Sequence, residues 1–143
     1  MGDRLVVDSS VVMKLFIDEE YSEDAHRLFE KLLDKAPPVF FAPDLMCLEC
    51  SNVLLKHVTK FAMPLSQAER SLSYLSALPL TVVPSTEIFS FAYRFAVELG
   101  ITAYDAAYVA ISEMLGCEFI TADKRLADKV SGRIGKIKWL GDL

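Results

Sequence analysis

The stretch Arg4-Leu5-Val6-Val7-Asp8 places an apolar, strand-like run directly before a carboxylate. Three other acids are embedded in apolar sequence in the same way: Glu49 in residues 45–50, Asp105 in residues 103–111, and Asp123 after residues 119–122. An ionised group removed from water must be paired, hydrogen-bonded or bound to a metal. Only Asp123 has a cation placed beside it, Lys124. A shared divalent cation would satisfy several carboxylates at once, which makes a metal-dependent site the leading hypothesis.

Outward from this first strand, strand and helix patterns alternate to the end of the chain. Short apolar runs predict strands at residues 5–7, 39–42, 80–83, 117–121 and 137–139. Helix signals predict helices at residues 23–33, 45–59, 66–78, 85–99, 102–115 and 123–130, and a short apolar segment at 10–16. This alternation predicts an α/β fold class, a single-domain three-layer sandwich around a central, mainly parallel sheet, over residues 1–143.

Helix starts and helix faces are also predicted from local patterns. Ser22 is expected to cap the helix at 23–33, and the spacing from Ser66 to Glu69 suits a capping box. Glu49 is expected on the face that packs on the sheet, together with an apolar stripe made of Leu45, Leu48, Val53, Leu55 and Val58. The helix that carries Asp105 is almost wholly apolar, so we expect it to be buried nearly all round.

The predicted layout brings two of the acids to one edge of the sheet. Asp8 follows the first strand and Asp123 follows the fourth. Ligands of open parallel sheets bind beyond the carboxyl ends of the strands. Each Asp alone has a structural alternative, because Asp8, Asp105 and Asp123 all stand where a helix is expected to begin. Glu49 has no capping role in the middle of its helix, and the four acids together favour a shared site.

Charge and composition limit the function classes. The net charge of −5 argues against a general nucleic-acid binder, but without the four embedded acids 16 acidic residues face 15 basic ones. Six basic residues crowd one stretch: Lys124, Arg125, Lys129, Arg133, Lys136 and Lys138. They could receive phosphates beside Asp123 or form a solvated basic face, and the sequence supports both equally. No apolar run approaches the roughly 18 residues of a membrane span.

Other constellations are disfavoured. Three cysteines without a signal peptide indicate reduced cytosolic thiols, and Cys47 and Cys50 fall within a predicted helix, which favours core cysteines over zinc. A dehalogenase-type phosphatase would require an Asp where Ser10 stands, and no glycine-rich phosphate loop follows any strand. The aromatic residues Phe89, Phe91, Tyr93 and Phe95 are interpreted as packing surfaces, with a dimer or partner helix as the alternative.

Four motifs also resemble those of a known family. The order and intervals of the acids are similar to PIN-domain nucleases, nearest to VapC-type toxins of toxin–antitoxin pairs, over essentially the whole chain. The resemblance is carried by Asp8-Ser9-Ser10 after a strand, Glu49 with Asn52-Val53-Leu54, Thr102-Ala103-Tyr104-Asp105-Ala106-Ala107-Tyr108-Val109-Ala110, and Thr121-Ala122-Asp123-Lys124-Arg125-Leu126.

The resemblance implies a PIN-like doubly wound sheet and endonucleolytic cleavage of RNA that depends on Mg²⁺ or Mn²⁺. It implies metal ligands and catalytic acids at Asp8, Glu49, Asp105 and Asp123, with Asp128 as an extra acid. Ser9 and Thr121 would supply hydroxyls that orient the carboxylates or a metal-bound water. Lys124, Arg125 and Lys129 are the candidate RNA contacts beside the acids.

The predicted function is therefore a cytoplasmic, divalent-metal-dependent endoribonuclease, a hydrolase that acts as the toxin of a toxin–antitoxin pair. The resemblance further implies a homodimer and inhibition by a small antitoxin protein, and the short apolar runs predict no membrane association. Two alternatives stay open: a catalytically silent PIN-like binding or scaffold module, and a housekeeping nuclease that processes ribosomal RNA. A scaffold has no need of four costly carboxylates, which argues against the first alternative.

Overall fold

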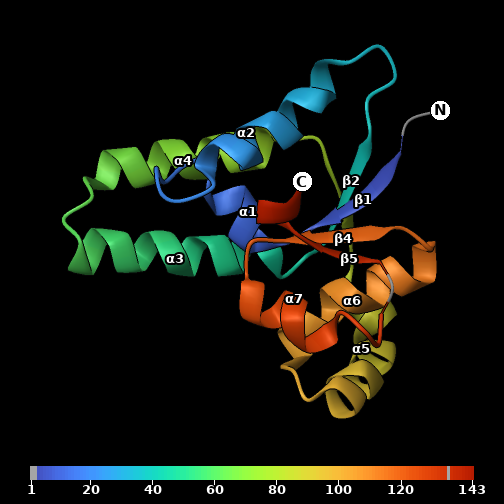
Figure 1. Ribbon diagram of the computed structural model, residues 1–143. Helices are drawn as coiled ribbons and strands as arrows, with labels where there is room; N and C mark the ends of the chain where they lie inside the picture. Colours follow the sequence, from blue (N-terminus) through green and yellow to red (C-terminus); the bar gives the residue numbers. More distant parts are fainter. Residues whose placement is uncertain (1–2, 135) are drawn as a thin grey trace.

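A five-stranded sheet lies at the centre of the computed structural model, which describes residues 3–134 and 136–143 (Figure 1). Its strands are β1 (Arg4–Val7), β2 (Val39–Pro43), β3 (Leu80–Val83), β4 (Glu118–Thr121) and β5 (Ile137–Trp139). They pair in the order β3-β2-β1-β4-β5, and every pair is parallel. The chain builds outward from β1 to β3 on one side and then adds β4 and β5 on the other. The space between the ends of β1 and β4 is therefore the topological switch point.

Helices cover both faces of the sheet (Figure 1). The chain forms α1 (Ser9–Met13), α2 (Ser22–Glu30), α3 (Met46–Lys60), α4 (Leu65–Ala77), α5 (Ser85–Leu99), α6 (Ala103–Leu115) and α7 (Lys124–Val130), with 3-10 turns at Lys31–Leu33 and Leu140–Asp142. Helices α5, α6 and α7 lie on one side of the sheet, whereas α3 and α4 form a hairpin that projects from the other. The predicted α/β fold with a central parallel sheet is confirmed. None of the helices in the described part has the length and apolar character required to cross a bilayer.

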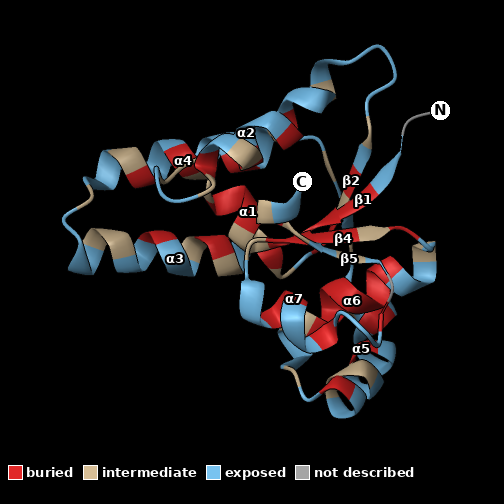
Figure 2. Cartoon of the chain, in the orientation of Figure 1, coloured by how far each residue is buried: buried red, intermediate tan, exposed pale blue. Residues whose placement is uncertain are grey.

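Burial is greatest in the two central strands and in α6 (Figure 2). Val6 and Val7 of β1 are fully buried, and Phe119 and Ile120 of β4 are nearly so. Strands covered on both faces are apolar at successive positions, which is why these runs do not alternate with polar residues. β3 lies at the edge, and Val82 on it is 49% exposed.

Helix α6 is buried along its middle, as its composition predicts. Every residue from Ala106 to Ser112 is buried, and the helix packs on β1, β2 and β4. Its small alanines allow this close approach to the sheet. Gly116 ends the helix with a φ of +62°, a left-handed conformation that glycine adopts without the strain a Cβ would bring. Asp105 is thereby carried on a rigid element.

The predicted packing face of α3 was only partly right: Leu45 and Val58 pack against the core, but the centre of the predicted stripe does not. Its buried residues are Met46, Cys50 and Leu54, which recur every four positions. Leu48 and Leu55, which were expected in the stripe that packs on the sheet, are 75% and 58% exposed. The helix has apolar residues on two faces, and hydrophobic periodicity did not distinguish the buried face from the exposed one. Glu49 lies beside the buried face and is half-buried.

Two predicted helix caps were also wrong, although both helices begin within one residue of the predicted start. Helix α2 begins at Ser22 itself, after Tyr21 in a left-handed conformation. The Ser22 hydroxyl does not cap the helix but forms hydrogen bonds with the preceding loop. That hydroxyl accepts a hydrogen bond from the Glu19 N–H at 2.9 Å and donates one to the Ile17 carbonyl at 3.1 Å. Helix α4 begins directly after Pro64, so Ser66 lies inside its first turn and does not cap it.

Helix α5 exposes part of its aromatic stretch. Phe89 and Tyr93 are 64% and 66% exposed, so the interpretation of these two residues as packing surfaces was wrong for the chain by itself. Phe91 and Phe95 contact each other edge to face, with ring centroids 4.8 Å apart. Phe89 and Tyr93 are four positions apart on α5, so their exposed rings form an apolar patch on one face of the helix.

Candidate active site

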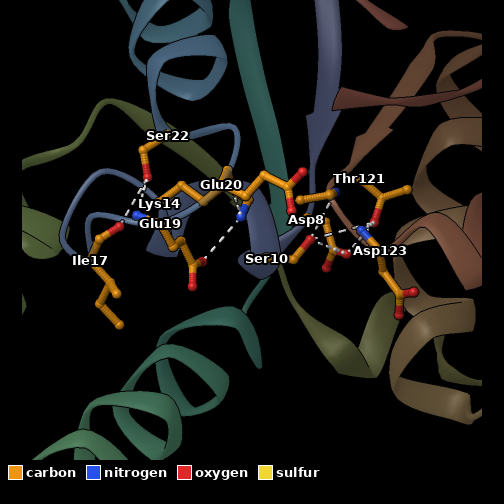
Figure 3. A network of polar contacts seen from close by, with 10 residues as sticks. Asp8, Ser10, Lys14, Ile17, Glu19, Glu20, Ser22, Thr121 and Asp123 are labelled. Carbon is orange, nitrogen blue, oxygen red and sulfur yellow. Dashed lines mark hydrogen bonds and ion pairs between the residues drawn. The ribbon is translucent and has the colours of Figure 1, made fainter. Parts of the chain in front are cut away.

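Asp8 is a buried carboxylate at the switch point between β1 and β4. It is 5% exposed, and its Oδ2 accepts hydrogen bonds from the Thr121 hydroxyl at 2.6 Å and from the Ser10 hydroxyl at 2.8 Å (Figure 3). Ser9 lies further away, with its Oγ 3.5 Å from Oδ1. Asp8 stands at the N-cap position of α1, but its side chain makes no cap hydrogen bond. The carboxylate is therefore committed to the site and not to the helix start.

The hydroxyls that hold Asp8 are themselves held by the backbone beyond β4. The Ala122 N–H donates to the Ser10 hydroxyl at 3.0 Å, and the Asp123 N–H donates to the Thr121 hydroxyl at 3.0 Å (Figure 3). These bonds join the end of β1 to the end of β4. Burial raises the pKa of Asp8, the two hydroxyls lower it, and the charge of Asp123 raises it.

Glu49 reaches the same region from α3. Its Oε1 accepts a hydrogen bond of 2.6 Å from the hydroxyl of Tyr108 on α6. Burial raises the pKa of Glu49 to about 7, and the charges of Asp8 and Asp105 add to this rise, whereas hydrogen bonds from Tyr108 and Ser9 oppose it. Glu49 is thus a carboxyl group that exchanges its proton near neutral pH.

Asp105 and Asp123 complete the acidic region, and both also stand at helix starts. Thr102 caps α6 by accepting the Asp105 N–H at 3.1 Å, and Asp123 caps α7 by accepting the Leu126 N–H at 3.1 Å. The capping alternative is therefore right for Asp123, which is exposed. Burial raises the pKa of Asp105, and the charges of Asp8 and Asp123 raise it further. Although Asp123 caps α7, its charge still raises the pKa values of Asp8 and Asp105.

The four acids are linked electrostatically, because the charge of at least one other acid raises the pKa of Asp8, of Glu49 and of Asp105. Besides burial, the charge of Asp123 raises the pKa of Asp8, and the charges of Asp8 and Asp105 raise the pKa of Glu49. The charges of Asp8 and Asp123 raise the pKa of Asp105. No Lys or Arg is among the main causes of these shifts. Within residues 3–134 and 136–143, no three His, Cys, Asp or Glu side chains converge tightly enough to form a ready coordination shell. Hard carboxylate oxygens that repel one another are nevertheless a donor set that fits Mg²⁺ or Mn²⁺.

Cavities adjoin the acids on more than one side. Thr102, Asp105, Asp123 and Arg125 line one cavity of about 270 Å³. A second cavity of about 270 Å³ lies between Ser9, Ser10, Lys14 and Asp123. Glu49 borders a larger cavity of about 680 Å³ along α3. The acidic region is therefore open to a ligand from the surface.

Most of the basic residues that were predicted near Asp123 have structural partners. Three donate to carbonyls at helix ends: Lys129 to Gly100 at 2.5 Å, Arg133 to Glu98 at 2.8 Å, and Lys136 to Gly116 at 2.6 Å. Such carbonyls carry the negative end of the helix dipole, which a cation stabilises. Lys138 pairs with Glu118 at 3.0 Å. The basic stretch is thus largely committed to closing helices α5 and α6.

Arg125 and Lys124 are placed differently. Arg125 lines the cavity that contains Asp105 and Asp123. Lys124 lies 4.8 Å from the centroid of the Trp139 ring and pairs with Asp128 at 3.3 Å. Asp128 is exposed and takes part in none of the recorded interactions among the four acids.

The cysteines lie as a structural role requires, with one exception. Cys50 and Cys117 are buried, and burial raises the pKa of the Cys50 thiol to about 12. Cys47 is exposed, so its interpretation as a core cysteine was wrong. It occupies the outer surface of α3, which the sequence had assigned to the inside.

Two functional candidates were not singled out from the sequence: Ser10, which holds Asp8, and Tyr108, which holds Glu49. Ser10 stands two residues after Asp8, and its hydroxyl was a local signal that was open to use. Tyr108 lies in an apolar run and is 59 positions from its partner, so no local pattern indicates the contact.

Comparison with known proteins agrees with this architecture. Residues 5–131 match the family model described as PIN domain. Ribonuclease VapC3 of Pyrobaculum aerophilum is 34% identical over 128 residues, which cover 88% of this chain and 94% of that protein. Ribonuclease VapC9 of Mycobacterium tuberculosis is 30% identical over 86 residues, which cover 60% of this chain and 66% of that protein.

Two solved structures share the fold at lower identity. A Pyrobaculum aerophilum protein superposes with a TM-score of 0.69 at 22% identity and covers 99% of this chain and 93% of its own. The Mycobacterium tuberculosis toxin VapC20, described as cleaving the sarcin–ricin loop, superposes with a TM-score of 0.60 at 17% identity and covers 86% and 94%. At these identities the two likenesses concern the fold alone.

Proposed function

Because the chain belongs to the PIN-domain family and its curated relatives are VapC ribonucleases, we propose that it is a divalent-metal-dependent endoribonuclease that hydrolyses RNA phosphodiester bonds. The observation that carries the proposal is the electrostatic group of four acids at the switch point of the sheet, with the buried Asp8 at its centre. Such a group is costly to a fold that does not use it.

In this proposal the metal is Mg²⁺ or Mn²⁺, and Asp8, Glu49, Asp105 and Asp123 would hold it. The cation supplies positive charge for the phosphoryl oxygens and lowers the pKa of coordinated water. The Thr121 and Ser10 hydroxyls orient the Asp8 carboxylate, since both donate to Oδ2. Oδ1 would then be the oxygen that holds the cation. Ser9 is 3.5 Å from Oδ1 and is a supporting hydroxyl.

RNA phosphates would enter through the cavity beside Asp105 and Asp123. Arg125 lines this cavity, and we assign it the main phosphate contact. Lys129 lines the same cavity but already donates to the Gly100 carbonyl, and Lys124 pairs with Asp128. Both lysines are therefore secondary contacts.

The proposal extends to a toxin role in the cytoplasm, with a small antitoxin protein and a second copy of the chain as partners. Its support is the VapC naming of the relatives and the apolar area that the chain exposes. That area is in two parts: Leu48, Leu55, Phe61 and Leu65 along the α3–α4 hairpin, and Phe89 and Tyr93 on α5. Isolated apolar residues are ordinary on a surface, but contiguous ones on neighbouring helices mark interaction sites.

Purified protein should be tested on a panel of structured and single-stranded RNAs with Mg²⁺, Mn²⁺ or EDTA. We expect cleavage with metal and none with EDTA. Asp8→Asn and Asp105→Asn should abolish cleavage and keep the fold, as judged by circular dichroism. Asp34→Asn changes an exposed acid far from the site in sequence and should cleave like the parent.

The result that would overturn the proposal is normal turnover by the Asp8 variant after contaminating nuclease has been excluded. Folded, metal-binding protein that cuts no RNA, even a total cellular RNA extract, would instead support a binding module. In that case capture of an RNA or protein partner would replace cleavage as the measured activity.

A further inference from the structure

Tyr108 is the polar contact of Glu49 that the proposed function does not use. Its side chain is fully buried in the middle of α6, and its ring stacks on Phe119 of β4 with centroids 5.6 Å apart and an interplanar angle of 12°. Its hydroxyl donates to Glu49 Oε1 at 2.6 Å. A buried tyrosine hydroxyl requires a partner, and here the partner is one of the four acids.

Glu49 needs such a contact because its own helix does not fix its direction. Helix α3 packs on α1 and α4 and projects from the sheet (Figure 1). The Glu49 side chain is long, half-buried, and borders the cavity of about 680 Å³ that Leu48, Asn52 and Tyr104 also line. It therefore has an outward direction open to it, away from the other acids. A hydrogen bond that selects one direction opposes the rotamer freedom of a glutamate.

The hydroxyl comes from the same helix as Asp105. Asp105 and Tyr108 are three residues apart on α6, so they project from neighbouring positions of one helix face. The helix is held against β1, β2 and β4. One rigid element thus carries both an acid of the site and the donor that grips a second acid from α3.

We propose that Tyr108 is a positioning residue whose hydroxyl fixes the Glu49 carboxylate beside Asp8 and Asp105 for coordination of a divalent cation. This inference rests on the proposed function for the identity of the cation. The contact is made to Oε1 and leaves Oε2 without a hydrogen bond from Tyr108. Partners that orient metal ligands in this way are typically worth 10- to 100-fold in metal affinity.

The test is Tyr108→Phe in the full chain, because phenylalanine keeps the ring and its stacking and removes only the hydroxyl. Mn²⁺ affinity should be measured by isothermal titration calorimetry after EDTA treatment and dialysis. We expect an affinity roughly 10- to 100-fold weaker than that of the parent. Tyr93→Phe is the matched control, since that tyrosine is 66% exposed on α5, and its Mn²⁺ affinity should be unchanged.

A double-mutant cycle separates positioning from general loosening of the core. In a Glu49→Gln background, Tyr108→Phe should weaken Mn²⁺ binding by no more than about twofold further, because its target is already lost. Thermal unfolding in EDTA establishes that each variant is folded. With the parent Glu49, excess Mn²⁺ should restore most of the RNA cleavage rate of Tyr108→Phe.

Parent-like Mn²⁺ affinity in Tyr108→Phe would overturn the inference, as would a folded parent protein that binds no Mn²⁺. A Tyr108→Phe variant that melts earlier but binds Mn²⁺ normally would identify the tyrosine as a packing residue only. A clear loss of Mn²⁺ affinity together with the absence of RNA cleavage in every variant would support the positioning role and overturn the nuclease proposal alone.

Discussion

The hydroxyl of Thr121, at the end of β4, donates to Oδ2 of Asp8, at the end of β1, over 2.6 Å and across 113 positions of sequence. The threonine is fully buried, and its oxygen also accepts the Asp123 N–H. A single oxygen atom therefore supports two of the four acids.

Replacing Thr121 with valine keeps the shape of the side chain and removes both contacts. We expect the free energy of unfolding to fall by about 1–3 kcal/mol near pH 8, because a buried carboxylate loses a donor. The loss should be smaller near pH 5.5, where Asp8 is more often protonated, since the bond lowers the pKa of Asp8. Urea denaturation at the two pH values measures this difference.

Thr81→Val on the exposed side of the edge strand β3 is the control for this substitution. It should change stability little and by the same amount at both pH values. Equal losses at both pH values for Thr121→Val would show that its hydroxyl does not interact with the charge of Asp8.

The metal-free protein should become less stable as pH rises from 5 to 8. The pKa of Glu49 is raised from 4.5 to about 7, so the folded state binds this proton more tightly than the unfolded state does. The stabilisation is fully present below pH 4.5 and is lost as pH rises through about 7. Asp8 and Asp105 shift in the same direction.

Denaturant titrations in EDTA at several pH values test this dependence. Glu49→Gln should flatten the profile, because the variant carries no titrating group at that position. A parent protein that gains stability steadily between pH 5 and 8 would contradict the raised pKa.

Divalent cations should raise the melting temperature, because they bind the folded acidic group and relieve its repulsion. An ion present at 100 times its dissociation constant stabilises the folded state by about 2.7 kcal/mol. The increase should be larger at pH 8 than at pH 6, since protons compete for the same carboxylates. Differential scanning fluorimetry with Mn²⁺ measures it, and an equal response in Asp8→Asn would place the binding elsewhere.

Arg125 and Lys136 should separate RNA binding from helix closure. Arg125→Met should weaken RNA binding and reduce the slope of log affinity against log salt by about 0.7 for a single-stranded ligand. Lys136→Met should cost about 0.3–1 kcal/mol of stability, because it leaves the carbonyl at the end of α6 without its cation, and should keep the salt slope. Fluorescence anisotropy in the Asp8→Asn background measures binding without cleavage. The reverse assignment of effects would mean that phosphates bind along the C-terminal basic stretch.

The fold could be predicted well because its elements are marked locally. The strand at 80–83 and the helix at 85–99 match β3 and α5 at both ends. The helix face of α3 could not be predicted, because its leucines are apolar on a surface that the chain leaves exposed. Hydrophobic periodicity reports that a face is apolar and does not report what covers it.

The four acids of the candidate site are marked in the sequence and their role as metal ligands stays a prediction, whereas the hydrogen bonds that hold them could be predicted only in part. Asp8, Glu49, Asp105 and Asp123 stand out because charge is unexpected in apolar sequence. The hydroxyl of Thr121 was assigned a supporting role from the resemblance, but the bond from Tyr108 to Glu49 joins distant helices and leaves no local trace. The basic stretch shows the opposite failure. A local cluster of charge suggested one surface, whereas two of its members donate to carbonyls at the end of α5 and a third to a carbonyl at the end of α6.

The sheet order has a consequence for the timing of activity during synthesis. β1 emerges first from the ribosome, but its partner β4 and the last acid, Asp123, follow more than a hundred residues later. Until then Asp8 lacks the Thr121 hydroxyl and the neighbouring strand. A chain still attached to the ribosome therefore has an incomplete acidic group through most of its translation. The parallel topology thus postpones completion of the acidic group until β4 and Asp123 have been synthesised.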